Sequence, residues 1–514
     1  MIKKVLLIDV ENLQRDNHNN ASQGFSQYPL GLMYLSSAVK SKFPNVKFKI
    51  FHTFTSTNPT GDLIELLHEY DPDLIGLRSL SVYKKDFQSV ANLVRENLPD
   101  KYIIAGGPYP SISYGEILKE NLVDLVCIGE GEETFQELFS RFQICDELPQ
   151  DVPGTVLCID NEIVINQGRP LIADINRIPF PDYSLIDMEQ YINATNQTFI
   201  RTKYASIFSS RGCPFQCFYC HKLFGKSIRR RSPENIVEEI KYLYDEKGIR
   251  DFIFLDDVFN VPLDKAKKVL SLISKSFDNI HIYFPNGLRA DYLDNEFVSL
   301  LEECGCVQVT LAIESASPRL QEYIGKRLNL ELAFENIDMI SRKFITSVMY
   351  IVGFPTETLS EVEETISFAE KLKYVTQPVL NILHIYEDSP LLKILSPNSE
   401  QMKFLDLQSQ TPHSERIIKN GFFVKPSFYG DYFSKELVPL NGSDILSINL
   451  KWIHKIVNDS VRIDNCYKVM KKYLSDDEIV LYYRGFLNNP DFIFDDLLRM
   501  MKHEVKNKKD SNSN

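Results

Sequence analysis

The sequence predicts an α/β protein: a doubly wound sheet first, a partial (β/α)6 TIM-type barrel second, and an α-rich C-terminal region last. Two observations carry this prediction. Across residues 1–142, short apolar runs alternate with amphipathic helical patterns, which is typical of a parallel sheet covered on both faces. Residues 204–388 contain six apolar strand candidates, each followed by a helical pattern. Residues 143–203 form a connector, and residues 389–514 show mostly helical patterns before a polar tail that we expect to be disordered.

The first region has five predicted strands, with helical patterns such as Leu30–Phe43 and Asp62–Tyr70 between them. Ligands of such sheets bind beyond the carboxyl ends of the strands, so the glycine-marked turns at 106–108 and 129–132 are candidate binding elements. Taken alone, each turn has an equally good interpretation as an ordinary tight turn. The predicted strands are Val5–Val10, Val46–Phe51, Leu74–Leu77, Tyr102–Ala105 and Leu125–Ile128.

The connector contains a predicted hairpin, with strands at Val156–Ile159 and Ile163–Ile165. A proline-rich segment, Pro179–Tyr183, follows as a stiff linker.

The second region places polar residues where its predicted strands end. In a parallel barrel the chemistry gathers at these carboxyl ends, although a helix N-cap is the alternative interpretation of any single residue. These residues are Asp256 and Asp257, Arg289 and Asp291, Glu314 and Ser315, and Gly353 to Pro355. The six predicted strands are Ala205–Ser209, Asp251–Leu255, His281–Phe284, Val307–Ile313, Ser347–Val352 and Val379–Ile385.

Three cysteines, Cys213, Cys217 and Cys220, lie within eight residues in a loop that follows the first barrel strand. With 9 cysteines in 514 residues, about 0.002 such triples are expected by chance. Thiolates suit iron–sulfur or zinc sites. A structural zinc site needs a fourth ligand, and His221 is too close to Cys220 for the usual spacing. The other alternative is a set of buried structural cysteines.

A basic run follows these cysteines and has two interpretations. It is either a solvated charged face or a phosphate or carboxylate contact at the mouth of a site. Ser232 and Pro233, which follow this run in the sequence, predict the start of a helix. The run consists of Lys222, Lys226, Arg229, Arg230 and Arg231.

Composition narrows the class of protein. The formal net charge of −13 argues against a general nucleic-acid surface. The sequence contains no stretch of about 18 uninterrupted apolar residues, so we predict no membrane span. Asp9 and Glu11 interrupt the first apolar run, which favours a buried strand over a signal peptide. We expect a cytoplasmic protein, because six cysteines are scattered and suit a reducing compartment: Cys127, Cys145, Cys158, Cys304, Cys306 and Cys466.

The cysteine spacing, with the aromatic Tyr219 before the last thiol, resembles the signature of the radical S-adenosylmethionine (SAM) superfamily. The resemblance implies a four-iron four-sulfur cluster held by Cys213, Cys217 and Cys220, with SAM on the open iron and Tyr219 among the SAM contacts. It further implies reductive cleavage of SAM to a 5′-deoxyadenosyl radical. An external electron donor such as flavodoxin or ferredoxin would supply the electron.

Residues at the barrel strand ends also resemble this family, in the stretches 254–259, 288–291, 312–317 and 352–358. The resemblance implies that Asp256 lies near the SAM amino group. It places Arg289, Glu314 and Ser315 near the methionine or ribose, and Gly353 near the adenine.

Residues 3–140 resemble the cobalamin-binding domain that precedes many radical SAM modules, through the stretches 28–35, 105–108 and 129–134. One departure is Tyr109, where the family commonly has His. The resemblance implies that five residues border the corrin and its nucleotide tail: Gly106, Gly107, Pro108, Gly129 and Gly131.

In the family, a protein ligand below the cobalt comes from the His of an Asp-x-His-x-x-Gly motif. Asp16 and His18 match it, but Ala21 stands where the glycine belongs. We therefore expect cobalamin to bind with its own base displaced and without a protein nitrogen below the cobalt.

These resemblances imply a cobalamin-dependent radical SAM enzyme, most simply one that methylates an unactivated carbon of a small-molecule or peptide natural-product precursor. The alternatives are a rearrangement or cyclisation, a first domain without cobalamin, and an iron–sulfur redox sensor. Methylthio transfer fits worse, because a second three-cysteine cluster would be needed and only Cys127 and Cys145 lie in the first domain. The residues that act directly on the substrate, and the substrate itself, are not predicted.

Overall fold

The first domain is a seven-stranded sheet with helices on both faces. The computed structural model of the chain describes residues 2–11, 13, 27–145, 147–192, 202–220, 224–385, 389–402, 405, 417–419, 422–424 and 428–479. The strand order is β2-β1-β3-β4-β5-β6-β7, and the first five strands are parallel. These strands are β1 (Lys4–Val10), β2 (Lys47–His52), β3 (Leu74–Ser79), β4 (Tyr102–Gly106), β5 (Leu125–Cys127), β6 (Thr155–Ile159) and β7 (Glu162–Ile165).

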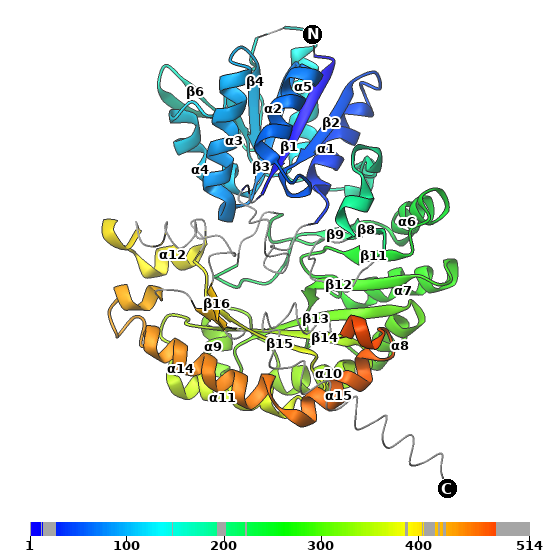
Figure 1. Ribbon diagram of the computed structural model, residues 1–514, viewed down its shortest axis with the longest axis vertical. Helices are drawn as coiled ribbons and strands as arrows, with labels where there is room; N and C mark the ends of the chain where they lie inside the picture. The colour runs from blue at the N-terminus through cyan, green and yellow to red at the C-terminus, as the bar shows by residue number, and fades with distance from the viewer. Residues whose placement is uncertain are drawn as a thin grey trace.

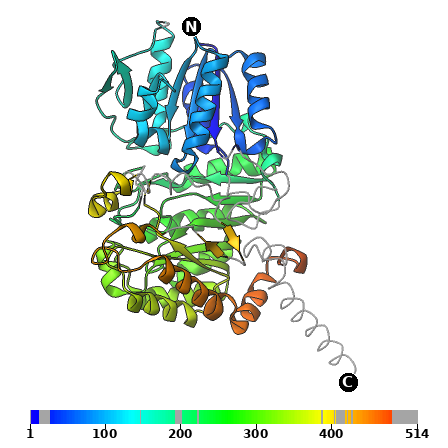
Figure 2. The ribbon, with the colours of Figure 1, turned by 60° about the vertical axis from the view of Figure 1, so that its left-hand side comes forward.

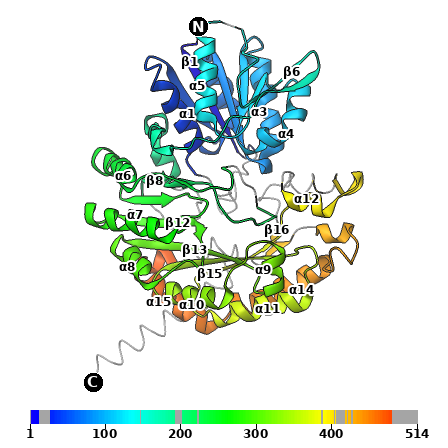
Figure 3. The same cartoon turned by 180° about the vertical axis from the view of Figure 1, so that it is seen from behind.

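Alternation along β1 shows how both faces of this sheet are buried. Leu6 and Ile8 pack in one apolar core, whereas Val5 and Leu7 pack in another on the opposite face. Two helices, α1 (Leu30–Lys40) and α5 (Gly131–Phe142), lie side by side over the second core (Figure 3). The first core is covered by α2 (Pro59–Tyr70), α3 (Lys84–Asn97) and α4 (Pro108–Lys119). The predicted doubly wound arrangement is confirmed.

The connector hairpin extends the sheet of the first domain. Strands β6 and β7 form the predicted hairpin, and β6 pairs antiparallel with β5. The proline-rich segment after the hairpin packs on α1, where Asp182 accepts a hydrogen bond from Lys40 Nζ at 2.6 Å.

The second domain is an open six-stranded barrel with every neighbouring pair of strands parallel. Its strand order is the order along the chain, and helices cover its outside (Figure 1). The strands are β8 (Tyr204–Ile207), β11 (Asp251–Phe254), β12 (His281–Leu288), β13 (Cys306–Glu314), β14 (Ile345–Val352) and β15 (Gln377–Ile382). The helices are α6 (Pro233–Lys247), α7 (Leu263–Ser276), α8 (Asn295–Glu303), α9 (Pro318–Tyr323), α10 (Leu330–Ser341) and α11 (Leu359–Lys371). Ser232 caps α6 and Pro233 begins it, as predicted.

The C-terminal region packs its described helices against the last barrel strands. Trp452 is buried, and its Nε1 donates to the carbonyl of Pro378 at 3.2 Å. Arg462, also buried, donates to the carbonyl of Val375 at 2.9 Å. The described elements are α12 (Pro390–Leu395), β16 (Ile417–Lys419), β17 (Phe422–Val424), a 3-10 helix (Tyr429–Tyr432), α14 (Gly442–Trp452), a π-helical turn (Ile453–Val457) and α15 (Ser460–Met470). The predicted disordered tail lies outside the described residues.

The first domain borders the barrel through the strand ends of its sheet. The N-terminus lies at the end of the molecule away from the barrel, so β1 and its parallel neighbours run toward the barrel (Figures 1 and 2). The carboxyl edge of the first sheet therefore borders the barrel. Among the described residues, no helix is long and apolar enough to cross a membrane.

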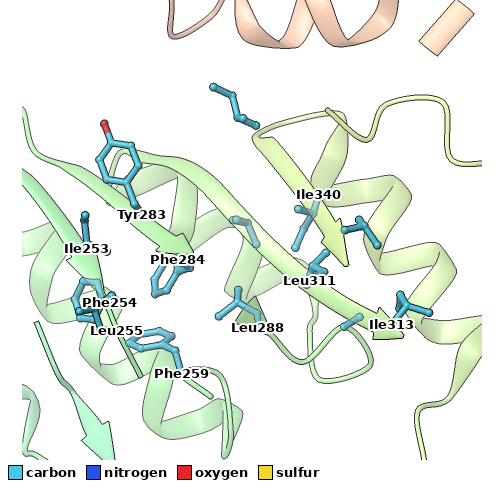
Figure 4. Packing of buried hydrophobic residues seen from close by; sticks show 14 of the residues in the cluster. Ile253, Phe254, Leu255, Phe259, Tyr283, Phe284, Leu288, Leu311, Ile313 and Ile340 are labelled. Atoms are coloured by element: carbon cyan, nitrogen blue, oxygen red, sulfur yellow. The ribbon is translucent and has the colours of Figure 1, made fainter. Parts of the chain in front are cut away.

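Aromatic rings fill the barrel near β11 and β12 (Figure 4). The ring of Phe259 lies 5.2 Å from that of Phe254 and 4.7 Å from that of Phe284, between ring centroids. All three residues are at most 1% exposed. Such contacts in a close-packed core leave no room for relaxation when a ring is removed.

We expect Phe284→Ala to lower the free energy of unfolding by about 3–5 kcal/mol, because it leaves a cavity among these rings. Urea unfolding followed by circular dichroism measures this loss. Phe277→Ala is the matched control, since Phe277 is only partly buried and should cost less. Equal losses at both positions would contradict this description of the core.

Candidate active site

The three cysteines lie on a loop closed by a short strand pair. We call residues 212–228 the cysteine loop. It leaves from β9 (Ser210–Arg211) and returns through β10 (Arg229–Arg230), which pairs antiparallel with β9. Gly212 has a φ of 94°, and a Cβ built there would lie 2.2 Å from the carbonyl oxygen of Ser227. Only glycine fits this close approach at the start of the loop.

Barrel segments also support the middle of the cysteine loop. The amide of Phe218 donates to the carbonyl of Ile324 at 3.2 Å, and the carbonyl of Phe218 accepts from the amide of Leu391 at the same distance. Gly325 has a φ of 72°, and a Cβ there would lie 2.6 Å from the carbonyl oxygen of Gln216. The ends of α9 and α12 thus fix the backbone that carries the thiols.

The three thiols are close enough to influence one another. Cys213 and Cys217 are half-buried and Cys220 is exposed as a whole residue. Desolvation of its sulfur by the surrounding protein, together with the charges of Cys217 and Cys213, raises the pKa of Cys220 to about 12. In the part of the chain that the structure describes, no three His, Cys, Asp or Glu side chains are placed to hold a metal ion as they stand. Three neighbouring thiols on one supported loop are a donor set that fits an iron–sulfur cluster.

Glu314 and Lys326 form an ion pair next to this loop. Lys326 Nζ donates to Glu314 Oε1 at 2.8 Å, and Tyr219 Oη donates to the same oxygen at 3.1 Å. The charge of Lys326 counteracts the upward shift of the Cys220 pKa. Glu314 ends β13 with a positive φ of 66°, an unusual backbone conformation for a side chain of this size. Sequence reasoning missed Lys326, because no motif singles it out.

Asp256 and Asp257 bond to the start of the cysteine loop. Asp256 accepts hydrogen bonds from the hydroxyls of Ser209, at 2.7 Å, and Ser210. Burial raises the pKa of Asp256, although these serines act in the opposite direction. Asp257 accepts from the amide of Gly212 at 2.9 Å. Both carboxylates therefore position the backbone that leads into the loop.

Arg289 contacts the cysteine loop and also donates hydrogen bonds to neighbouring barrel groups. Its Nε donates to Asp291 at 2.8 Å and its Nη2 donates to the carbonyl of Arg327 at 2.9 Å. The guanidinium carbon lies 3.7 Å from the ring centroid of Phe215, which belongs to the loop. These contacts make Arg289 a support for the loop, in addition to any contact with a ligand.

Gly353 is covered by the C-terminal region. It has a φ of 92°, and a Cβ there would lie 2.7 Å from the ring of Phe428. Its amide donates to Glu357 at 2.6 Å, and its carbonyl accepts from Tyr429 Oη at 2.5 Å. Burial raises the pKa of Glu357 to about 8. The role of Phe428 and Tyr429 in covering this turn was not predictable from their sequence context.

Ser315 is wholly buried beside Glu314. Its Oγ accepts from the amide of Ser317 at 3.2 Å and lies 3.3 Å from Thr365 Oγ1.

The predicted glycine turns lie at the carboxyl edge of the first sheet. Gly107 has a φ of 87°, and a Cβ there would lie 2.8 Å from Arg78 Cγ. A Cβ on Gly131 would lie 2.9 Å from Leu35. Gly129 differs: its φ is 83°, but a Cβ there would meet no protein atom within 4 Å. Gly129 therefore borders open space, as a turn that admits a bulky ligand requires.

The neighbours of these turns complete this edge. Gly106 ends β4 and Pro108 begins α4. Tyr109 points into the core, where its ring lies 5.2 Å from that of Phe87. Asp16, His18 and Ala21, the residues weighed for a ligand motif, lie outside the described residues.

The described arginines of the basic run contact the protein itself. Arg229 pairs with Glu130 at 2.6 Å and Arg231 pairs with Glu239. Arg230 donates to the carbonyls of Phe259 and Val261. The interpretation as a solvated face is therefore wrong for these three residues.

Comparisons with known proteins agree with this arrangement. The model of the radical SAM superfamily matches residues 207–369, and that of the B12 binding domain matches residues 19–139. An uncharacterised methyltransferase of Pyrococcus horikoshii is 31% identical over 349 residues, which are 67% of this chain and 73% of that protein. The cytidylyl-2-hydroxyethylphosphonate methyltransferase of Streptomyces wedmorensis is 27% identical over 401 residues, with the same two shares.

A solved structure shares the fold. The cobalamin-dependent SAM radical enzyme OxsB, with aqua-cobalamin and SAM bound, superposes with a TM-score of 0.62 at 18% identity, covering 98% of this chain and 75% of that one. This chain therefore belongs to the radical SAM superfamily, in the group that also carries a B12-binding domain. It is a radical SAM enzyme whose cofactors are a [4Fe-4S] cluster, SAM and cobalamin.

We expect Cys217→Ala to abolish the iron–sulfur cluster, because the two remaining thiols cannot hold three iron corners. Iron and sulfide analysis of the anaerobically reconstituted protein, with its visible absorbance, measures the loss. Cys304→Ala is the control, since Cys304 is buried and donates to the carbonyl of Leu270 at 3.0 Å. Full iron content in Cys217→Ala would contradict the assignment of the ligands.

Proposed function

We propose that this enzyme transfers a methyl group to an unactivated carbon of a small-molecule or peptide natural-product precursor. One observation carries this proposal: two relatives named methyltransferases align with about two thirds of the chain. The presence of a B12-binding domain supports it, since cobalamin is a carrier suited to methyl groups. The carboxyl edge of the first sheet borders the barrel, so a substrate between the two domains would reach both cofactors.

The residues of the barrel edge have separate roles in this proposal. Cys213, Cys217 and Cys220 hold the cluster. When bound, the cluster and SAM supply one-electron chemistry and cobalamin supplies the methyl group. Glu314 accepts hydrogen bonds from the cofactor's ammonium or ribose hydroxyls, and Lys326 balances its charge. Asp256 lies near the SAM amino group, and Arg289 and Ser315 also contact SAM while they keep the strand ends and the loop in place. Tyr219 and Gly353 border the SAM site.

The residues of the first sheet's edge hold the cobalamin in this proposal. Gly106, Gly107 and Pro108 border one side of it, and Gly129 and Gly131 border the other. The cofactor's own base is displaced, and no protein nitrogen replaces it below the cobalt.

Products formed from SAM alone distinguish methyl transfer from the other candidate functions. The reduced, cobalamin-loaded enzyme should convert SAM to both 5′-deoxyadenosine and S-adenosylhomocysteine, because a methyltransferase uses SAM in both ways. Liquid chromatography with mass spectrometry quantifies the two products. A rearranging or cyclising enzyme would give 5′-deoxyadenosine alone, and a redox sensor would give neither product; either result would overturn the proposal.

We expect Glu314→Gln to weaken SAM binding roughly ten- to a hundredfold, the effect of losing a charge-assisted hydrogen bond. Equilibrium dialysis with the reconstituted enzyme measures the affinity. Glu322→Gln is the matched control, because Glu322 forms an exposed pair with Arg327 close to the same segment. Unchanged SAM affinity in Glu314→Gln would remove Glu314 from the SAM site.

A further inference from the structure

Two arginines at the base of the cysteine loop point toward the first domain. In the two-residue ladder of β9 and β10, Arg211 is the cross-strand partner of Arg229, and Ser210 is the partner of Arg230. Neighbouring side chains on a strand point to opposite faces. Ser210 and Arg230 accordingly contact barrel groups, whereas Arg211 and Arg229 contact the first domain.

One carboxylate, Glu130, accepts hydrogen bonds from both of these arginines. Arg211 Nη1 donates to Glu130 Oε1 at 3.0 Å, and Arg229 Nη1 donates to Glu130 Oε2 at 2.6 Å. The side chains of Glu130 and Arg211 are 3% and 5% exposed. Burial alone would raise the pKa of Glu130, but Arg229 and Arg211 outweigh it and hold the pKa below its usual value. The carboxylate is thus charged and shared between the two strands.

Further contacts fix the orientation of this group. Arg211 Nη2 donates to Glu132 Oε1 at 2.6 Å, and its guanidinium carbon lies 5.4 Å from the ring centroid of Tyr34. Glu130 Oε2 also accepts from the amide of Ile172 at 2.8 Å. We call Glu130, Glu132, Arg211 and Arg229 the interdomain ion network. Like charges directly opposite each other destabilise a strand pair, so the ladder needs Glu130 between its two arginines.

Glu130 links the interdomain ion network to the predicted cobalamin site. Glu130 stands between Gly129 and Gly131, in the turn assigned above to cobalamin. It precedes α5 but makes no capping bond to that helix, because its oxygens are used by the arginines. The same turn therefore contacts the cobalamin space on one side and both ends of the cysteine loop on the other.

We propose that the interdomain ion network is a positioning device, which fixes the cysteine loop relative to the cobalamin turn and thereby sets the separation of the two cofactors. The proposal rests on the proposed function, because methyl transfer needs both cofactors near one substrate carbon. Buried ion pairs are weak contributors to net stability but lose much when one partner is removed. A network of this kind therefore specifies one arrangement of the two domains.

Hydrogen–deuterium exchange of the full chain tests the device without any cofactor. Glu130→Gln keeps the size of the side chain and removes its charge. Amides of residues 212–220 and of residues 128–132 should both exchange roughly tenfold faster than in the wild type. Glu239→Gln is the matched control, because Glu239 pairs with Arg231 beside the same ladder but within the barrel domain. It should speed exchange near α6 and leave residues 128–132 unchanged.

Electron paramagnetic resonance of the reduced enzyme, with its cofactors bound, gives a second measurement. A general loss of stability does not change this signal. In Glu130→Gln, the signal splitting caused by the spin–spin interaction between cobalt(II) and the reduced cluster should become broader. In Glu239→Gln, this splitting should keep its wild-type form. If Glu130→Gln does not fold, Glu132→Gln should change the same two segments together. Wild-type exchange in both segments of Glu130→Gln would overturn the positioning role, whether or not the enzyme transfers methyl groups.

Discussion

The arrangement of the two domains depends on buried charges where their sheets meet. Arg211 and Glu130 come from different domains, and both are almost inaccessible to solvent. Removing charged groups from water is tolerated only when each finds an opposite charge and hydrogen bonds. Neither domain can shift relative to the other without leaving one of these groups unpaired. The carboxyl edge of the first sheet, where ligands of such folds bind, is thereby held against the barrel.

Much of this fold was predictable because its determinants are local in the sequence. Strands buried on both faces are continuous apolar runs, and each predicted strand of both sheets lies within four residues of its observed ends, as for Val307–Ile313 against Cys306–Glu314. The cysteine loop was equally visible, since its ligands occur within eight residues. The connector hairpin was predicted, but its pairing with β5 was not, because its sequence does not indicate which edge strand it pairs with.

The partners of the charged residues were not predictable, because they come together only through packing. Glu130 and Arg229 are 99 residues apart in the sequence, and Tyr429 and Gly353 are 76 apart. A run of arginines indicates positive charge, but it does not indicate whether these side chains contact solvent, a ligand or another domain. Arg289 shows the same limit: its position at a strand end gave no sign that it pairs with Asp291 and stacks on Phe215.

The central claim is that the iron–sulfur cluster and the cobalamin occupy facing edges of the two domains, joined by the interdomain ion network. Anomalous X-ray scattering at the iron and cobalt absorption edges, from a crystal of the loaded enzyme, locates both metals directly. We predict iron beside Cys213, Cys217 and Cys220, and cobalt in the space bordered by Gly129, on the side of the first sheet that faces the barrel. Cobalt at any other face of the first domain, or iron away from the cysteine loop, would contradict the account.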